Sequence, residues 1–176
     1  MEASRRPMTT WTIIPSAIDR NTRLVSLALV SNINGYLHDV RRTSEVAHRH
    51  GAYVYADIIQ GAGAVPIDVQ AMGIDFAACG AYKWLMGDFG FGFLYVREDL
   101  QDRVVGRSRY GVRQFTSPNN TQADSQFALR PGAARYESGS FSYCGGTCAH
   151  AALRYIRELS VPNIRSHARQ LTDRLQ

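Results

Sequence analysis

The sequence is nearly devoid of lysine. It holds one, Lys83, and all the other basic residues among its 20 Lys+Arg are arginine. We attribute this usage to a compositional bias of the source genome, which makes a retained amine informative. A guanidinium stays protonated and cannot form an imine, whereas a desolvated lysine amine can condense with an aldehyde. Lys83 is therefore a candidate nucleophile, and a surface lysine is the alternative.

Long hydrophobic runs are also missing. No apolar stretch approaches the roughly 20 residues that a membrane helix needs. The first 16 residues include two arginines but no continuous apolar segment typical of a signal peptide. With 176 residues, 45% hydrophobic and 20% charged, the composition is that of an ordinary soluble domain. We expect a cytoplasmic protein without a membrane partner.

Clustered positive charge is absent although the net charge is +5. The arginines are scattered, and the densest group is Arg103, Arg107, Arg109 and Arg113. No known nucleic-acid motif accompanies this group, so we expect no nucleic-acid partner.

Cysteine is scarce and odd in number, which excludes a disulfide framework. Cys144 and Cys148 lie four apart, without the CxxC spacing and second pair typical of zinc sites. His48 and His50 lie two apart at the end of a helical pattern, where they would point to different sides. We expect free thiols, a solvated helix end and no metal site.

What is present is an alternation of strands and helices. Apolar, β-favouring runs predict strands at 24–30, 52–56, 76–79 and 90–96. A helix is expected over 39–50, closed by Gly51, and a short helical piece over 69–72. This order is typical of an α/β fold with a mostly parallel sheet flanked by helices.

The second half of the chain is less regular. A polar turn or helix start is expected at 97–99. Residues 106–135 are polar and weakly periodic, which favours an extended surface segment lying against a partner subunit. Helical spacing returns from Thr147, with a break predicted at 160–162.

Three polar residues directly follow predicted strands: Asn32, Asp57 and Lys83. Active residues of α/β sheets gather at the carboxyl ends of strands, so we expect these three loops to meet. Asp57 lies among apolar residues, and a buried carboxylate needs a cationic partner. The pyridinium nitrogen of pyridoxal phosphate (PLP) is one such partner. The alternative is an Asp that caps the following turn.

The order of these residues resembles a known family. Asp57-x-x-Gln60, then Lys83 twenty-six residues after the aspartate, then a glycine-rich turn and a strand, resemble the class V aminotransferases among fold-type I PLP enzymes. Cysteine desulfurases, selenocysteine lyases and kynureninases belong to the same superfamily. The similarity runs from about residue 13 to the end of the chain. It implies the PLP-dependent transferase large domain as the fold.

The resemblance also implies roles for four residues. Lys83 matches the Schiff-base lysine, which later serves as the general base, and Asp57 matches the acid paired with the pyridine nitrogen. Gln60 matches the amide that hydrogen-bonds the ring hydroxyl. Asn32 matches the asparagine of a turn beside the cofactor and substrate. A solvated loop amide remains the alternative for Gln60, and a plain turn former for Asn32.

Two further positions are similar to family motifs with changes. Where many members have Ser-x-His-Lys, this chain has Gly80, Ala81, Tyr82 and Lys83. The Tyr82 phenol can donate to the phosphate, or it can be a packing aromatic. The Tyr-Lys pair resembles kynureninases, which makes cysteine desulfurase activity a weaker expectation.

The segment 135–140 resembles the family's R-x-E-x-G-T motif, with Ser140 in place of the threonine. The resemblance implies that the Ser140 hydroxyl contacts the phosphate in the neighbouring subunit, and hence a homodimer with shared sites. An ordinary serine turn at a helix start is the alternative.

For the whole chain we expect an N-terminal extension at 1–12, the later portion of the large PLP-binding domain at 13–145, and helices leading to a missing C-terminal domain at 146–176. The chain would be a fragment or a truncated gene product. The predicted function is PLP-dependent chemistry on an amino acid or other amine. A non-catalytic piece with weak or no PLP binding is the main alternative. A Rossmann nucleotide binder, suggested by glycines alone, lacks the GxGxxG pattern.

Overall fold

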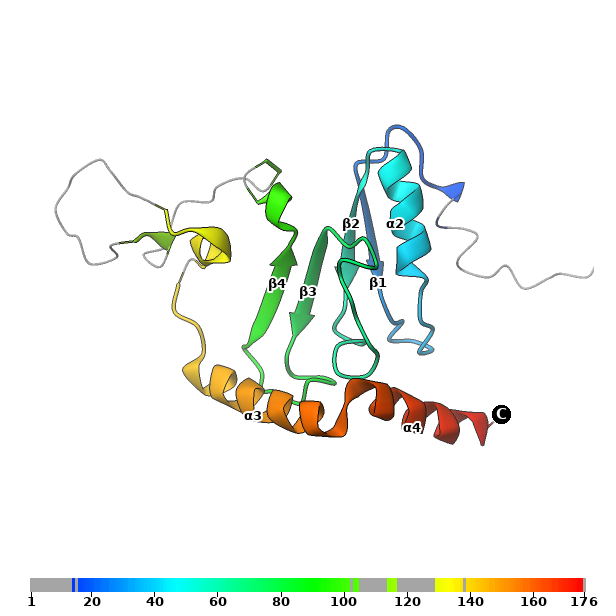
Figure 1. Cartoon of the computed structure of the whole chain (residues 1–176), viewed down its shortest axis with the longest axis vertical. Coiled ribbons are helices and arrows are strands. Elements are labelled where there is room, and N and C mark those ends of the chain that lie inside the picture. Colours follow the sequence, from blue (N-terminus) through cyan, green and yellow to red (C-terminus); the bar gives the residue numbers. More distant parts are fainter. Residues whose placement is uncertain are drawn as a thin grey trace, which may run out of the picture.

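The computed structural model describes residues 14, 16–101, 103–104, 114–116, 129–137 and 139–175. Its four strands form one sheet in the order β1-β2-β3-β4 (Figure 1). They span β1 Leu24–Ala28, β2 Tyr53–Asp57, β3 Phe76–Gly80 and β4 Gly92–Val96. The first three strands are parallel, and β4 pairs antiparallel with β3. The predicted α/β fold with a mostly parallel sheet is confirmed.

Helix α2 (Val40–Arg49) packs against β2. The Asp39 carboxylate caps its first turn by accepting from the Arg42 amide at 3.0 Å. Its buried face includes Val40 and Ala47, and alternate residues of β2, such as Val54, are fully buried. The core therefore lies between this helix and one face of the sheet.

Helices α3 (Tyr143–Leu159) and α4 (Val161–Asp173) follow one another across the end of the sheet where β3 finishes (Figure 1). The Ser142 hydroxyl caps α3 by accepting from the Gly145 amide at 3.0 Å. Near its other end, α3 buries Ile156 in the core. The two helices thus lie beside the edge of the sheet from which the loop after β3 emerges.

Some predicted boundaries were wrong for identifiable reasons. Residues 69–72 form a single hydrogen-bonded turn and no helix. The Asp68 carboxylate caps the start of this turn by accepting from the Gln70 and Ala71 amides, but Gly73, with φ of 65°, ends it after one turn. Helix α3 begins four residues before Thr147, since Ser142 supplies its cap. The break between α3 and α4 is Ser160 alone, with φ of 69°.

The helix start expected after β4 is confirmed as the 3₁₀ helix η1 (Glu98–Leu100). Of the predicted surface segment 106–135, only 114–116 and 129–135 are described. There Phe115 and Leu129 form an antiparallel bridge, and a 3₁₀ helix, η3, follows at Gly132–Tyr136. The rest of that segment and the proposed extension 1–12 lie outside the described residues.

A buried carboxylate that the sequence did not single out ties several elements together. Asp75 is fully buried and accepts from the Val54 amide at 2.8 Å, from His48 Nε2 at 2.9 Å and from the Arg97 guanidinium. The expectation that His48 is only part of a solvated helix end was wrong, because its ring reaches back to this carboxylate. Helix α2, β2, β3 and the end of β4 therefore share one polar anchor.

Within the part of the chain that the structure describes, no helix has both the length and the apolar character to cross a bilayer.

Candidate active site at the carboxyl edge of the sheet

The loops that carry Asn32, Asp57 and Lys83 leave three adjacent parallel strands at the same edge. Asp57 is the last residue of β2 and is registered with Ala28 of β1 and Ala78 of β3. The Leu29 amide donates to the Asp57 carbonyl at 2.8 Å, so the strands remain paired up to the point where the loops begin. The topology thus gathers the predicted residues at one edge, as parallel strands require.

Asp57 is exposed there, and the expectation of a buried carboxylate was wrong. Its Oδ1 accepts from the Ile59 amide at 3.0 Å, so the turn-capping interpretation is correct for one oxygen. The carboxylate nevertheless stands at the open edge between the fully buried Ala56 and the buried Ile58. The Asp57 carboxylate is therefore fixed by the following loop through the Ile59 amide while the residue stays exposed to solvent.

Lys83 lies half-buried in a tightly closed turn after β3. The Met86 amide donates to the Lys83 carbonyl at 2.9 Å, and the Gly87 amide donates to the Ala81 carbonyl at 2.8 Å. Met86 has φ of 53°, a left-handed conformation that costs a non-glycine residue about 1 kcal/mol. Backbone strain of this kind persists where the surrounding structure holds it, and here it lies three residues from the amine.

Gln60 is joined to the residue after the lysine. The Trp84 indole Nε1 donates to Gln60 Oε1 at 3.2 Å, across 24 residues of sequence. Sequence reasoning did not single out Trp84. Its position next to Lys83 could have drawn attention to it, but its hydrogen bond to Gln60 on another loop cannot be inferred without the fold.

Tyr82 stacks on Phe89, with ring centroids 4.7 Å apart and an interplanar angle of 17°. The packing interpretation is therefore correct for its ring, while the residue stays 41% exposed. A Cβ added at Gly80 would lie 2.8 Å from Tyr82 Cε1. The two departures from the usual motif, Gly80 and Tyr82, therefore lie in contact with one another.

Asn32 lies exposed in the turn after β1. Other residues make the hydrogen bonds of that turn: Ser31 Oγ accepts from the Ile33 amide, and Asn34 Oδ1 accepts from the Tyr36 amide. No hydrogen bond of the Asn32 side chain occurs within the described residues, so the turn does not depend on it.

Ser140 is exposed two residues before the Ser142 cap of α3, so it is not the cap of that helix. In the described ranges no hydrogen bond joins it to the other candidate residues. A Cβ added at Gly145 would lie 2.9 Å from the Cβ of Phe91, which precedes β4. This contact brings the start of α3 close to the loop that carries Lys83, but the structure does not bring Ser140 into contact with the lysine.

Cys79 is a buried thiol on β3. Burial, followed by the negative charge of Asp57, raises the pKa of this thiol from 9.0 to about 11. The thiol is therefore neutral at physiological pH.

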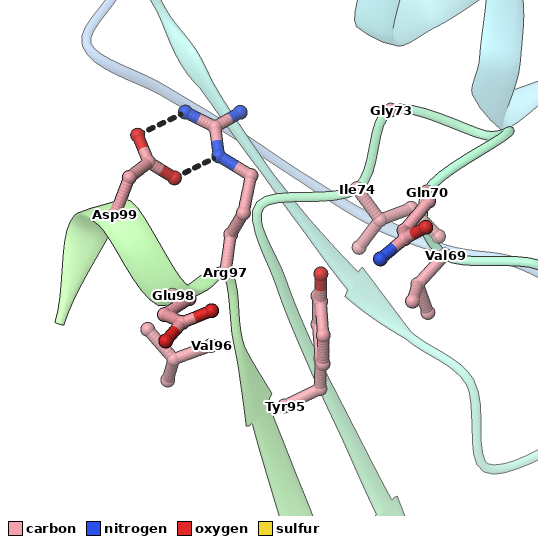
Figure 2. Close-up of a pocket in the computed structure, with 9 residues that line it drawn as sticks. All are labelled: Val69, Gln70, Gly73, Ile74, Tyr95, Val96, Arg97, Glu98 and Asp99. Carbon is pink, nitrogen blue, oxygen red and sulfur yellow. Dashed lines mark hydrogen bonds and ion pairs between the residues drawn. The ribbon is translucent and has the colours of Figure 1, made fainter. Parts of the chain in front are cut away.

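A cavity among the described residues lies elsewhere. An open cavity of about 720 Å³ lies at the opposite end of β3 and β4, lined by residues such as Ile74, Tyr95 and Glu98 (Figure 2). Arg97 and Asp99 form a two-point ion pair at its rim (Figure 2). Because Phe76 pairs with Val96 while Gly80 pairs with Gly92, this cavity and the Lys83 turn are at opposite ends of the β3–β4 pair.

The family description Aminotransferase class-V matches residues 1–176. This chain belongs to the class-V aminotransferase family. It is 30% identical over 162 residues to a probable cysteine desulfurase of Methanothermobacter thermautotrophicus, covering 92% of this chain and 39% of that protein. It is also 30% identical over 174 residues to a kynureninase of Pseudomonas fluorescens, covering 91% and 38%. This class-V chain thus spans about two fifths of the length of these relatives.

Solved structures agree on the fold. The apo cysteine desulfurase of Thermococcus onnurineus superimposes with a TM-score of 0.82 at 26% identity, covering 99% of this chain and 42% of that one. A C-DES variant with glycine covalently linked to its PLP cofactor superimposes with a TM-score of 0.75 at 23% identity, covering 86% and 39%. The class-V chain therefore has the fold of part of a fold-type I PLP enzyme.

Proposed function

We propose that this class-V chain carries the lysine-bearing portion of a PLP-dependent enzyme that acts on an amino acid or another amine. One observation supports this most directly: the only lysine of the chain leaves the same sheet edge as Asp57 and Gln60. PLP, the cofactor predicted from the sequence, is confirmed by the family and by the solved C-DES relative.

The residues at this edge fit the chemistry of that cofactor group by group. The Lys83 amine suits its aldehyde, the Asp57 carboxylate suits a protonated pyridine nitrogen, and the Gln60 amide suits the ring oxygen. We assign a phosphate contact to the Tyr82 hydroxyl and a place beside the cofactor and substrate to Asn32. Asp57 is exposed and uses one carboxylate oxygen in its own turn, so an oxygen remains for the pyridine nitrogen.

The reaction follows from what these side chains can do. When bound, the cofactor supplies an electron sink for the pair released at the α-carbon of the substrate. With the cofactor bound, the Lys83 amine would accept the proton from that carbon as general base. Asp57 would hold the pyridine nitrogen of the cofactor in its protonated form. Transamination, elimination and epimerisation separate only after this step, and Tyr82 at the usual histidine position disfavours the cysteine desulfurase branch.

A homodimer with shared sites belongs to the same proposal. Ser140 would serve the phosphate of the neighbouring subunit, which agrees with its exposed position away from Lys83 in its own chain. Sedimentation velocity tests this part: we expect a dimer at micromolar concentration, and a monomer throughout would contradict it.

The second candidate is a non-catalytic piece with weak or no PLP binding. It is favoured by the coverage of 38–39% of the relatives' length, because a partial fold supplies only part of a cofactor site.

One experiment separates the two. The protein is incubated with PLP, reduced with borohydride and mapped by peptide mass spectrometry. Lys83 and the N-terminal amine are its only primary amines, so nonspecific labelling would be detected at the N-terminus. We expect the adduct on Lys83, and its loss in Lys83→Arg, which keeps the charge but cannot form an imine. A sample that is folded by circular dichroism yet gives no Lys83 adduct would establish the non-catalytic alternative.

A further inference from the structure

The loop after β2 and the turn after β3 contact each other at two points, which together we call the clasp. One is the hydrogen bond from Trp84 Nε1 to Gln60 Oε1, at 3.2 Å. The other is a backbone contact, since a Cβ added at Gly63 would lie only 2.4 Å from the Trp84 carbonyl oxygen. The segment Gln60–Gly63 therefore lies directly against the residue that follows Lys83.

The chemistry of the first contact determines how the Gln60 amide is turned. An amide can present either its oxygen or its nitrogen to a neighbour, and the two ends are normally hard to distinguish. An indole N–H can only donate, so the Gln60 oxygen must face Trp84. The Gln60 NH₂ group, with its two donors, is then directed away from the indole.

The exposure of Trp84 indicates that this contact is not a by-product of core packing. Its side chain is 55% exposed, whereas Leu85, the next residue, is buried in the core. A large aromatic kept at the surface loses much of the hydrophobic gain that normally explains a tryptophan. The specific contribution of this side chain is therefore its indole N–H, which donates to Gln60.

We propose that Trp84 is a positioning residue that holds the Gln60 amide with its NH₂ group available to the ring oxygen of the cofactor. This inference rests on the proposed function. Without the indole, the amide is free to rotate and to turn its carbonyl oxygen, an acceptor, toward the electron-rich ring oxygen. Trp84 acts through Gln60 and need not touch the cofactor.

The first test needs no cofactor. The chain has two tryptophans, so the indole N–H region of a ¹⁵N spectrum holds two signals, which Trp11→Phe assigns. We expect Gln60→Leu to shift the Trp84 indole signal and to speed its exchange with solvent about fivefold, the change expected for loss of a hydrogen bond. The Trp11 signal is the internal control. An unchanged Trp84 signal in a folded Gln60→Leu protein would overturn the inference.

The second test uses the PLP-loaded protein and its visible absorption band. A donor to the ring oxygen competes with the proton shared between that oxygen and the Lys83 nitrogen, so loss of the donor raises the apparent pKa of the band. We expect Gln60→Leu to raise it by about 1 unit and Trp84→Phe, which keeps the aromatic ring, by about half a unit in the same direction.

The double variant decides whether Trp84 acts through Gln60. Trp84→Phe is expected to add nothing to the band titration in a Gln60→Leu background, and Trp11→Phe is expected to leave the titration unchanged. An equal shift from Trp84→Phe with and without Gln60 would contradict the inference. Absence of a Lys83 adduct would instead contradict the proposed function. The cofactor-free ¹⁵N spectra would still show whether the Trp84 indole is hydrogen-bonded to Gln60.

Discussion

At the candidate site, contacts with neighbouring side chains affect the conformation and the protonation of single residues. Tyr82 lies over the space that a side chain at residue 80 would fill, so Gly80 and Tyr82 belong together. The Cys79 thiol has its pKa raised to about 11 by burial and then by the negative charge of Asp57. The turn that carries Lys83 is closed by its own backbone hydrogen bonds, from the Met86 and Gly87 amides.

Cys79 gives a prediction for thiol reactivity. Because burial raises its pKa to about 11, it should resist iodoacetamide at pH 8, while the exposed Cys144 is labelled. Site-resolved mass spectrometry measures both in one sample. Labelling of Cys79 at pH 8 as fast as that of Cys144 would show that it is neither buried nor shifted.

The same thiol makes stability depend on pH in a defined window. The folded-state pKa lies above the unfolded value of 9.0, so the native state binds the proton more tightly. The contribution of the neutral thiol is complete below pH 9 and is lost as the pH rises through about 11, for a cost of roughly 1 to 3 kcal/mol. Urea unfolding at pH 8 and pH 11 should show a smaller drop in Cys79→Ala than in the parent protein.

Among the structural elements, the loop after β2 and the turn after β3 form a functional unit. Gly63 has φ of 91° and lies against the Trp84 carbonyl, so it meets two requirements that only glycine satisfies. Helices α3 and α4 lie across this end of the sheet, where the Gly145 contact with Phe91 supports the other end of the lysine loop (Figure 1).

Gly63→Ala should therefore destabilise the fold by about 2 to 4 kcal/mol, since it combines a left-handed backbone with a clash against backbone atoms. Gly35→Ala is the matched control: φ there is 69°, but a Cβ would meet nothing within 4 Å, so only about 1 kcal/mol should be lost. Denaturant unfolding measures both. Equal losses of unfolding free energy in the two variants would show that the contact between Gly63 and Trp84 does not contribute to the destabilisation.

On the scale of the whole molecule, the Asp75 anchor is a buried polar link between several elements. It connects helix α2 through His48, β2 through the Val54 amide and the end of β4 through Arg97. Asp75 directly precedes β3, at the end of the sheet away from Lys83, and its partner Arg97 lines the cavity of Figure 2. This separation places the stabilising charge network at one end of the sheet and the candidate chemistry at the other.

Asp75→Ala is predicted to cost about 3 to 5 kcal/mol, because it leaves a buried amide without an acceptor and removes the common partner of His48 and Arg97. Asp99→Asn, which changes an exposed carboxylate on the same arginine, should change stability little. Thermal unfolding compares the two. A mild effect of Asp75→Ala would show that the anchor is dispensable.

Much of the architecture was predictable from the sequence because local patterns produce it. The four strands and α2 follow from apolar runs, helical periodicity and glycine signals, and the helix start after β4 follows from a polar segment directly after a strand. The turn at 69–72 was mistaken for a helix because it begins with a helix-like cap at Asp68, while Gly73, with φ of 65°, ends it after one turn.

Lys83, Asp57 and Gln60 could be selected from the sequence because imine chemistry, a strand end and a motif spacing are properties of the chain itself. The hydrogen bond from Trp84, the ring of Tyr82 over Gly80 and the return of His48 to Asp75 could not, since each joins side chains that only folding brings together. The sequence therefore determined the chemical groups and the order of strands that gathers them at one edge. Only the tertiary structure decided how those groups are turned and held, because orientation depends on contacts between distant residues.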